Sequence, residues 1–283
     1  AISRRFLIDK TMTEKELLIN AQEGNIRAFH TLFSEFQPQL KSYLYRLLAD
    51  RNDMEDMAHD VFILAFEKLP QFRAEASLKT WVFTIATNHA KRHLKNQKRW
   101  NTNTFELTRE FAHNNPEAMN KIDHASQYSP HRVYEIREHI DYCFTCISKM
   151  LTLEQQITLI LKNIYSFKVK EIADIMGESQ GVVKHLLHDA RKTMISIFDD
   201  TCAFVSQKGI CNQCSGLNGK FNPKQDQQAE LMKIKMVKNR ASYKRDAFFD
   251  LRMELVQAID PLHGNGADLH EAFMKINHQV NTL

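Results

Sequence analysis

Apolar residues recur at helical spacing through the first third of the chain. Between residues 28 and 48 they fall three and four positions apart, and Pro38 marks a kink or a break in that run. Upstream, Thr13 and Glu16 have the spacing of a capping box, which starts a helix. We therefore expect residues 13–99 to fold as one compact helical unit.

A second apolar pattern, from about residue 133 to 200, predicts another helical unit. Within it, Ala173, Gly177 and Val183 have the spacing of a helix-turn-helix, in which a small residue lets two helices approach and glycine permits the positive-φ turn. Valine then anchors the second helix, which Ser179 can cap. The expected buried side of the motif consists of Ile172, Ile175, Met176, Val182, Leu186 and Leu187.

Three further segments lack the pattern of a compact unit. Residues 100–132 are rich in Asn, Thr, Glu, His and Ser and have little periodicity, so we expect a flexible linker. Residues 201–225 contain Gly and Cys, and residues 226–283 predict a C-terminal helical extension. A long helix over residues 226–259 and a final helix over residues 269–280 would form a helical hairpin. The expected fold class is all-α.

Composition adds only modest constraints. The 283 residues suffice for one large or two smaller domains, and the hydrophobic content of 43% is ordinary for a soluble globular protein. Only 8 Gly and 6 Pro favour helix over sheet, and the net charge of +4 is mildly basic. No apolar run approaches the roughly 18–20 residues that span a bilayer. The first ten residues do not resemble a secretory signal, so we expect a cytoplasmic protein without a membrane segment.

The acidic start of one helix is the first candidate site. It carries four carboxylates within eight residues, on Asp53, Glu55, Asp56 and Asp60. No glycine-rich loop or second carboxylate cluster stands nearby to complete a catalytic set, so we expect no enzyme. The helix that follows turns strongly basic. This order suggests one face for a protein partner and another for a polyanion.

Two groups of residues are candidates for nucleic-acid binding. Thr80 and Trp81, beside the loop aromatic Phe72, could stack against or wedge beside unpaired bases, although both aromatics could equally be core residues. Downstream on one side of the basic helix lie residues suited to phosphates or base edges, namely Asn88, His89, Arg92, Lys95 and Arg99. The second helix of the helix-turn-helix offers a polar row to a major groove, namely Ser179, Gln180, Lys184, His185, His188, Arg191 and Lys192. The alternative is a solvated basic face.

Five cysteines raise the question of a metal. Cys202, Cys211 and Cys214 could bind zinc if a fourth ligand is supplied, for which Cys143, Cys146 and His188 are the candidates. The alternative is that these are small buried residues with free thiols.

The two helical units resemble the two conserved domains of the extracytoplasmic-function (ECF) group of bacterial sigma factors. DMEDMAHDVF resembles the acidic helix of that group, LKTWVFTIATNHAKRHLKNQKR its basic helix, and VKEIADIMGESQGVVKHLLHDAR its C-terminal helix-turn-helix. The resemblance covers about Leu17–Arg99 and Val133–Phe198. Residues 201–283 have no counterpart in minimal members of the group.

The resemblance implies a promoter-specificity subunit that works with core RNA polymerase. The four carboxylates would face the clamp helices of the β′ subunit, and the second unit would meet the β flap. The loop from Phe72 to Lys79, with the basic helix after it, would melt and hold the −10 promoter element, and the helix-turn-helix would read the −35 element. Independently of the resemblance, the apolar stripe of the extension would otherwise be exposed, so we expect the extension to dock a partner such as an anti-sigma or recruiting protein. The alternative is a stand-alone helix-turn-helix regulator.

Overall fold

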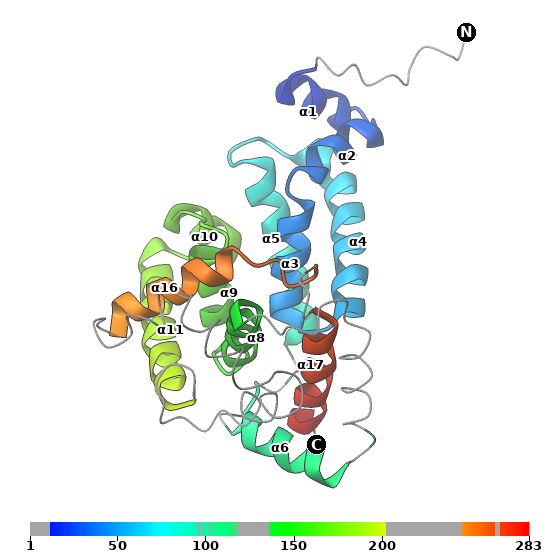
Figure 1. Ribbon diagram of the computed structural model, residues 1–283. Helices are drawn as coiled ribbons and strands as arrows, with labels where there is room; N and C mark the ends of the chain where they lie inside the picture. The colour runs from blue at the N-terminus through cyan, green and yellow to red at the C-terminus, as the bar shows by residue number, and fades with distance from the viewer. Residues whose placement is uncertain are drawn as a thin grey trace.

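A computed structural model describes residues 12–95, 97, 99–101, 103–115, 117, 136–201, 245–263 and 267–282. Over these residues all regular structure is helical (Figure 1), as expected. None of the described helices is both long and apolar enough to cross a membrane.

The N-terminal unit consists of five α-helices and one short 3-10 helix. They are α1 (Glu14–Gln22), α2 (Ile26–Ser34), α3 (Gln37–Leu48), α4 (Arg51–Lys68), η1 (Leu69–Gln71) and α5 (Leu78–Leu94). The capping box forms, because Thr13 Oγ1 accepts from Glu16 N at 3.3 Å and Thr13 N donates to Glu16 Oε2 at 2.8 Å. The predicted break also forms, since Pro38 lies in the first turn of α3.

The helix-turn-helix unit contains four helices. They are α8 (Ile136–Ser148), α9 (Leu153–Asn163), α10 (Val169–Met176) and α11 (Gln180–Thr201). Thr152 caps α9, accepting from Gln155 N at 3.2 Å. The segment between the two units, for which we expected a flexible linker, contains α6 (Thr104–Asn114).

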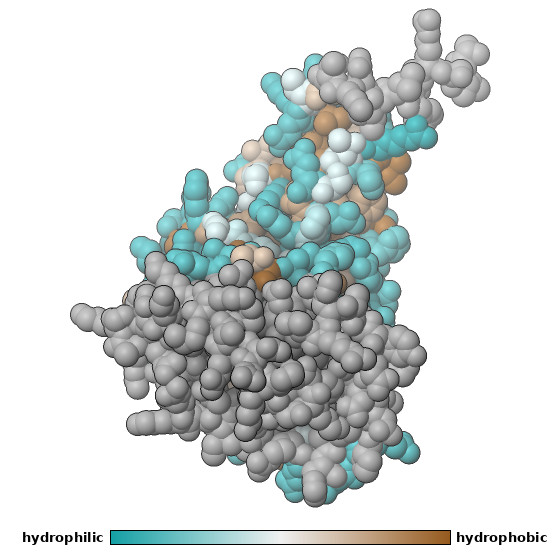
Figure 2. All heavy atoms as spheres, viewed as in Figure 1, coloured by the Kyte–Doolittle hydropathy of each residue, from teal (hydrophilic) through white to brown (hydrophobic). Residues whose placement is uncertain are grey.

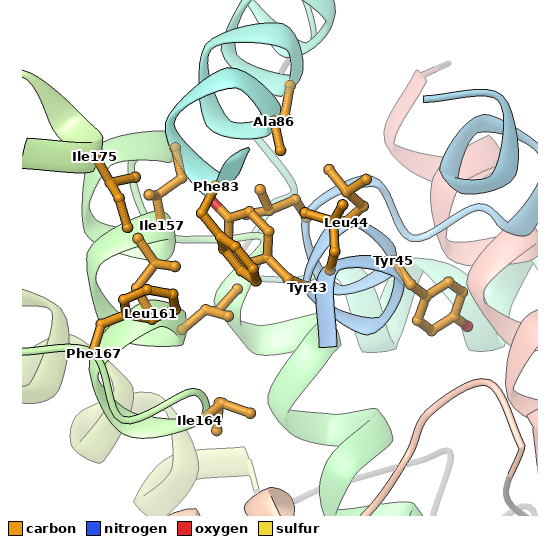
Figure 3. Packing of buried hydrophobic residues seen from close by; sticks show 14 of the residues in the cluster. Tyr43, Leu44, Tyr45, Phe83, Ala86, Ile157, Leu161, Ile164, Phe167 and Ile175 are labelled. Carbon is orange, nitrogen blue, oxygen red and sulfur yellow. The ribbon is translucent and has the colours of Figure 1, made fainter. Parts of the chain in front are cut away.

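The two units share one apolar core. Helix α5 packs on α10, and α3 packs on α9. Phe83 of α5 is fully buried, and its ring centroid lies 5.3 Å from that of Tyr43 and 5.0 Å from that of Phe167 in the other unit. Figure 3 shows these side chains together with Leu161. In this state the units are therefore packed directly against each other.

The C-terminal extension contributes two described helices, α16 (Arg245–Gln257) and α17 (Ala267–Thr282). Instead of packing mainly on each other as the predicted hairpin, they lie against other helices of the chain (Figure 1). Helix α16 packs on α8 and α11, and α17 packs on α6 and α8. The apolar side chains Phe249, Met253, Val256 and Met274 are buried there.

Candidate nucleic-acid interface

The helix-turn-helix has the geometry that its sequence predicts. Gly177 ends α10 with φ 69°, and Gly177 N and Glu178 N both donate to Ala173 O. Ser179 Oγ accepts from Val182 N at 3.3 Å, which caps the start of α11. Val183 is fully buried and fixes α11 against the core. The side of α11 opposite Val183 therefore faces away from the core and is exposed to solvent.

That side of α11 carries polar residues. The exposed members of the predicted row are Ser179, Gln180, Lys184, His185, His188 and Lys192. Val182 was expected to be buried, but 41% of it is exposed. It lies at the start of α11, two residues after Gln180, and the core contact falls on Val183 instead. An exposed valine among polar residues could contact a thymine methyl group in a major groove.

Arg191 differs from the rest of the row. It is only half-exposed and lies against α16, where it donates to Asp250 Oδ1 at 2.5 Å and to Asp250 Oδ2 at 3.0 Å. Its guanidinium carbon is 4.9 Å from the ring centroid of Phe249. These hydrogen bonds raise the pKa of Arg191, so its charge is held by the extension.

The loop and basic helix of the N-terminal unit are partly closed off. Phe72 is buried, with its ring centroid 5.0 Å from that of half-buried Trp81. Thr80 is also buried and shares a 2.8 Å hydrogen bond with Ser77, the cap of α5. Asn88 is exposed, as are Arg92 and Lys95 further along α5.

Two of the candidate cations touch the other unit. Lys79 Nζ lies 5.0 Å from the ring centroid of Phe167, and burial lowers the pKa of Lys79. Arg99 donates to Leu151 O at 2.6 Å and to Gln156 Oε1 at 2.5 Å. Burial lowers the pKa of Arg99 to about 10. Both side chains are half-buried against the helix-turn-helix unit.

The acidic helix α4 lies along the surface. Asp56 is exposed, whereas the other three carboxylates each have a basic neighbour. Glu55 Oε2 is 2.6 Å from Lys41 Nζ, Asp60 Oδ2 is 3.7 Å from His89 Nε2, and Asp53 Oδ2 is 3.6 Å from His93 Nε2. The acidic helix α4 therefore lies beside the basic helix α5, and Asp53 and Asp60 of α4 each face a histidine of α5.

Apolar surface accompanies these carboxylates. Exposed isoleucines belong to α1, α2 and α4, namely Ile19, Ile26 and Ile63, and Figure 2 shows brown surface over this part of the molecule. Ile63 follows Asp56 by seven residues and Asp60 by three, so the three side chains lie on one face of α4. A mixed apolar and acidic face is typical of a protein-binding surface.

Two of the five cysteines lie in the described part of the chain. Cys143 and Cys146 are buried in the core, and Cys146 Sγ lies 3.6 Å from Met274 Sδ. Within the described residues, no three His, Cys, Asp or Glu side chains gather as a metal site would require. Cys202, Cys211 and Cys214 lie outside the described residues, so zinc stays a prediction.

The two units match known families. Residues 32–99 match the model of sigma-70 region 2, and residues 143–194 match that of sigma-70 region 4. RNA polymerase sigma-H factor of Pseudomonas aeruginosa is 27% identical over 183 residues, which are 64% of this chain and 91% of that protein. RNA polymerase sigma factor YlaC of Bacillus subtilis is 28% identical over 56% of this chain and 86% of its own length. ECF RNA polymerase sigma-E factor of Haemophilus influenzae is 35% identical over 31% of this chain and 46% of its own length.

Together, a helical unit of the region 2 type and a helix-turn-helix of the region 4 type define a transcription initiation factor. The chain belongs to the ECF group of sigma factors. It is a promoter-specificity subunit of RNA polymerase and not an enzyme, and it acts on core RNA polymerase and promoter DNA. A stand-alone regulator is not favoured, because the chain matches region 2 as well as region 4.

The structure also reveals a residue that the sequence did not indicate. Arg46 of α3 is 1% exposed and donates to Asp141 Oδ1 of α8 at 2.6 Å and to Tyr165 OH at 2.7 Å. It donates as well to the backbone carbonyls of Val256 and Ile259 in the extension, at 3.4 Å and 3.2 Å. One guanidinium thus joins the N-terminal unit, the helix-turn-helix unit and the extension.

Proposed function

We propose that this sigma factor divides promoter recognition between its two units. The exposed polar row of α11 reads the −35 element in the major groove, and the loop before α5 with α5 itself melts and holds the −10 element. The observation that supports this most directly is the helix-turn-helix geometry, with Gly177 at positive φ and Gln180 and Lys184 exposed at the start of α11. Residues at that end of a recognition helix contact base edges, and later ones contact phosphate.

The acidic face of α4 docks on core polymerase, at the clamp helices of β′, and the helix-turn-helix unit meets the β flap. Asp56 and Asp60 share this face with exposed Ile63. Complementary charge steers association and excludes wrong partners, while the apolar side chain adds buried area. The C-terminal extension provides a further surface for an anti-sigma or recruiting protein.

Transcription by holoenzyme reconstituted from this protein and core RNA polymerase tests the proposed division of promoter recognition. The purified protein with core enzyme should start RNA synthesis at defined genomic sites, and substitution of Gln180 or Lys184 should change which −35 sequences are used. A failure to start RNA synthesis at any genomic site would overturn the proposal.

Charge reversal tests the docking face. Asp56→Lys should weaken binding to core polymerase at least tenfold, because a like charge at a complementary interface costs several kcal/mol. Glu35→Lys is the matched control, since Glu35 is equally exposed but lies at the end of α2. Equal binding by the two variants would show that α4 does not dock on the polymerase.

A further inference from the structure

The packing of the two units against each other is incompatible with simultaneous binding to the −10 and −35 elements. The −10 and −35 elements have centres about 25 base pairs apart, which is about 85 Å along B-DNA. Helix α5 touches α10 directly, and α10 has 8 residues, a length of about 12 Å. The base-reading end of α11 follows α10 after three residues, so it cannot stand 85 Å from α5. The protein must open before it engages both elements.

Helix α16 binds Arg191, a side chain that the recognition helix would otherwise offer to a DNA phosphate. Its residues Asp246, Phe249 and Asp250 are spaced by three and four positions and so share one face. Besides the two bonds to Asp250, Arg191 Nε donates to Asp246 Oδ1 at 3.3 Å and Arg191 Nη2 to Asp246 O at 2.8 Å. A carboxylate binds the guanidinium fork in the same bidentate way as a phosphate does. While these bonds last, Arg191 cannot bind DNA.

The same extension is also tied to the N-terminal unit, to α6 and to α8 of the helix-turn-helix unit. Carbonyls at the end of α16 accept from Arg46, as described above. In α17, Asn277 Nδ2 donates to Tyr142 OH at 2.9 Å, and Asn277 Oδ1 accepts from Thr108 Oγ1 of α6 at 2.6 Å. Glu271 Oε1 accepts from Arg51 N of α4 at 3.4 Å. The extension therefore lies across the joint between the units.

We propose that α16 and α17 form an intramolecular clamp, which holds the two units closed and occupies Arg191 in the free protein. The clamp rests on the proposed function, because it blocks the opening that promoter recognition requires. Asp246 and Asp250 of α16 act in it as a substitute for DNA phosphates, and release of α16 frees both the recognition helix and one side of Arg46.

The ion pairs that attach α16 to α11 are more exposed than the ion pair that joins the two units beside the end of α16. The side chains of Asp246 and Asp250 are 78% and 56% exposed, whereas those of Arg46 and Asp141 are 1% and 4% exposed. Exposed ion pairs are weak and are screened by salt, and buried pairs are screened much less. The contact between α16 and α11 therefore opens first, and salt or competing phosphate promotes its opening.

The test uses the full chain without polymerase. Asp246→Asn/Asp250→Asn removes both carboxylates from Arg191. Glu254→Gln/Glu35→Gln is the control, which removes two charges from exposed positions, one further along α16 and one at the end of α2. The first variant should bind duplex DNA about fivefold more tightly than the wild type. The slope of log affinity against log salt should steepen by about 0.9, the contribution of one added phosphate contact. The control should shift affinity less and leave the slope unchanged.

Hydrogen exchange gives an independent readout. Amides of α16 should exchange faster in the first variant, while those of α2–α4 stay as in the wild type. Unchanged or weaker DNA binding, or unchanged exchange in α16, would overturn the clamp. These outcomes do not depend on RNA synthesis: a protein that fails to support transcription but gains DNA affinity in this variant would refute the proposed division of promoter recognition and leave the clamp standing.

Discussion

The buried ion pair between Arg46 and Asp141 should control whether the two units unfold together. Arg46→Met would leave the carboxylate of Asp141 buried without its guanidinium, and loss of one partner from a buried pair costs about 3–5 kcal/mol. Burial already raises the pKa of Asp141, with Arg46 acting in the opposite direction. The double variant Arg46→Met/Asp141→Leu removes both charges, so its loss of unfolding free energy should be smaller than that of the single variant.

The measurement is urea unfolding of the wild type, the two single variants Arg46→Met and Asp141→Leu, and the double variant. Trp100 is buried at the joint, where Trp100 N donates to Lys149 O at 3.3 Å, so its fluorescence reports separation of the units. Far-UV circular dichroism reports loss of helix. In Arg46→Met the fluorescence change should precede the loss of helix, whereas in the wild type the two should coincide. A loss below about 1 kcal/mol, with additive effects in the double variant, would show that the pair does not couple the units.

Three further predictions concern single features. Burial lowers the pKa of Lys149 to about 7, so the folded state holds this proton less tightly than the unfolded chain. The free energy of unfolding should therefore rise by up to about 1.4 kcal/mol per pH unit from about pH 7 to pH 10 and level off below pH 7, and urea titrations of Lys149→Met should lack this component. Gly177→Ala should lower stability by about 1–2 kcal/mol through its positive φ, and Gly177→Asn by less, as thermal unfolding would show; equal losses would contradict the backbone explanation. Metal analysis of reduced protein should find near-stoichiometric zinc, which Cys211→Ser/Cys214→Ser should abolish; its absence from the wild type would end the zinc prediction.

The sequence predicted those features that are set by local rules. A capping box at Thr13, a break at Pro38 and a glycine turn at Gly177 each depend on a few neighbouring residues, and all three are confirmed. The exposure of Val182 was predicted wrongly, because apolar spacing alone cannot decide which of two adjacent valines faces the core.

Contacts between distant segments were not predictable in this way. Arg46 and Asp141 are 95 residues apart, and nothing near either residue marks the other as its partner. The same holds for Arg191 and Asp250, which are 59 residues apart. Basic residues that the sequence assigned to DNA are partly engaged within the protein, since a pattern of charge shows what a side chain can bind and not what it binds in the free state. Their contacts with DNA remain predictions.

Because α16 lies late in the chain, the closed state can form only near the end of synthesis. Helix α11 ends at Thr201 and α16 begins at Arg245, so the ribosome completes both DNA-binding units before it makes the helix that covers Arg191. At 5–20 residues per second, the intervening stretch takes roughly 2–9 s to translate. A nascent chain therefore passes through a brief period in which its recognition helix is made and not yet covered.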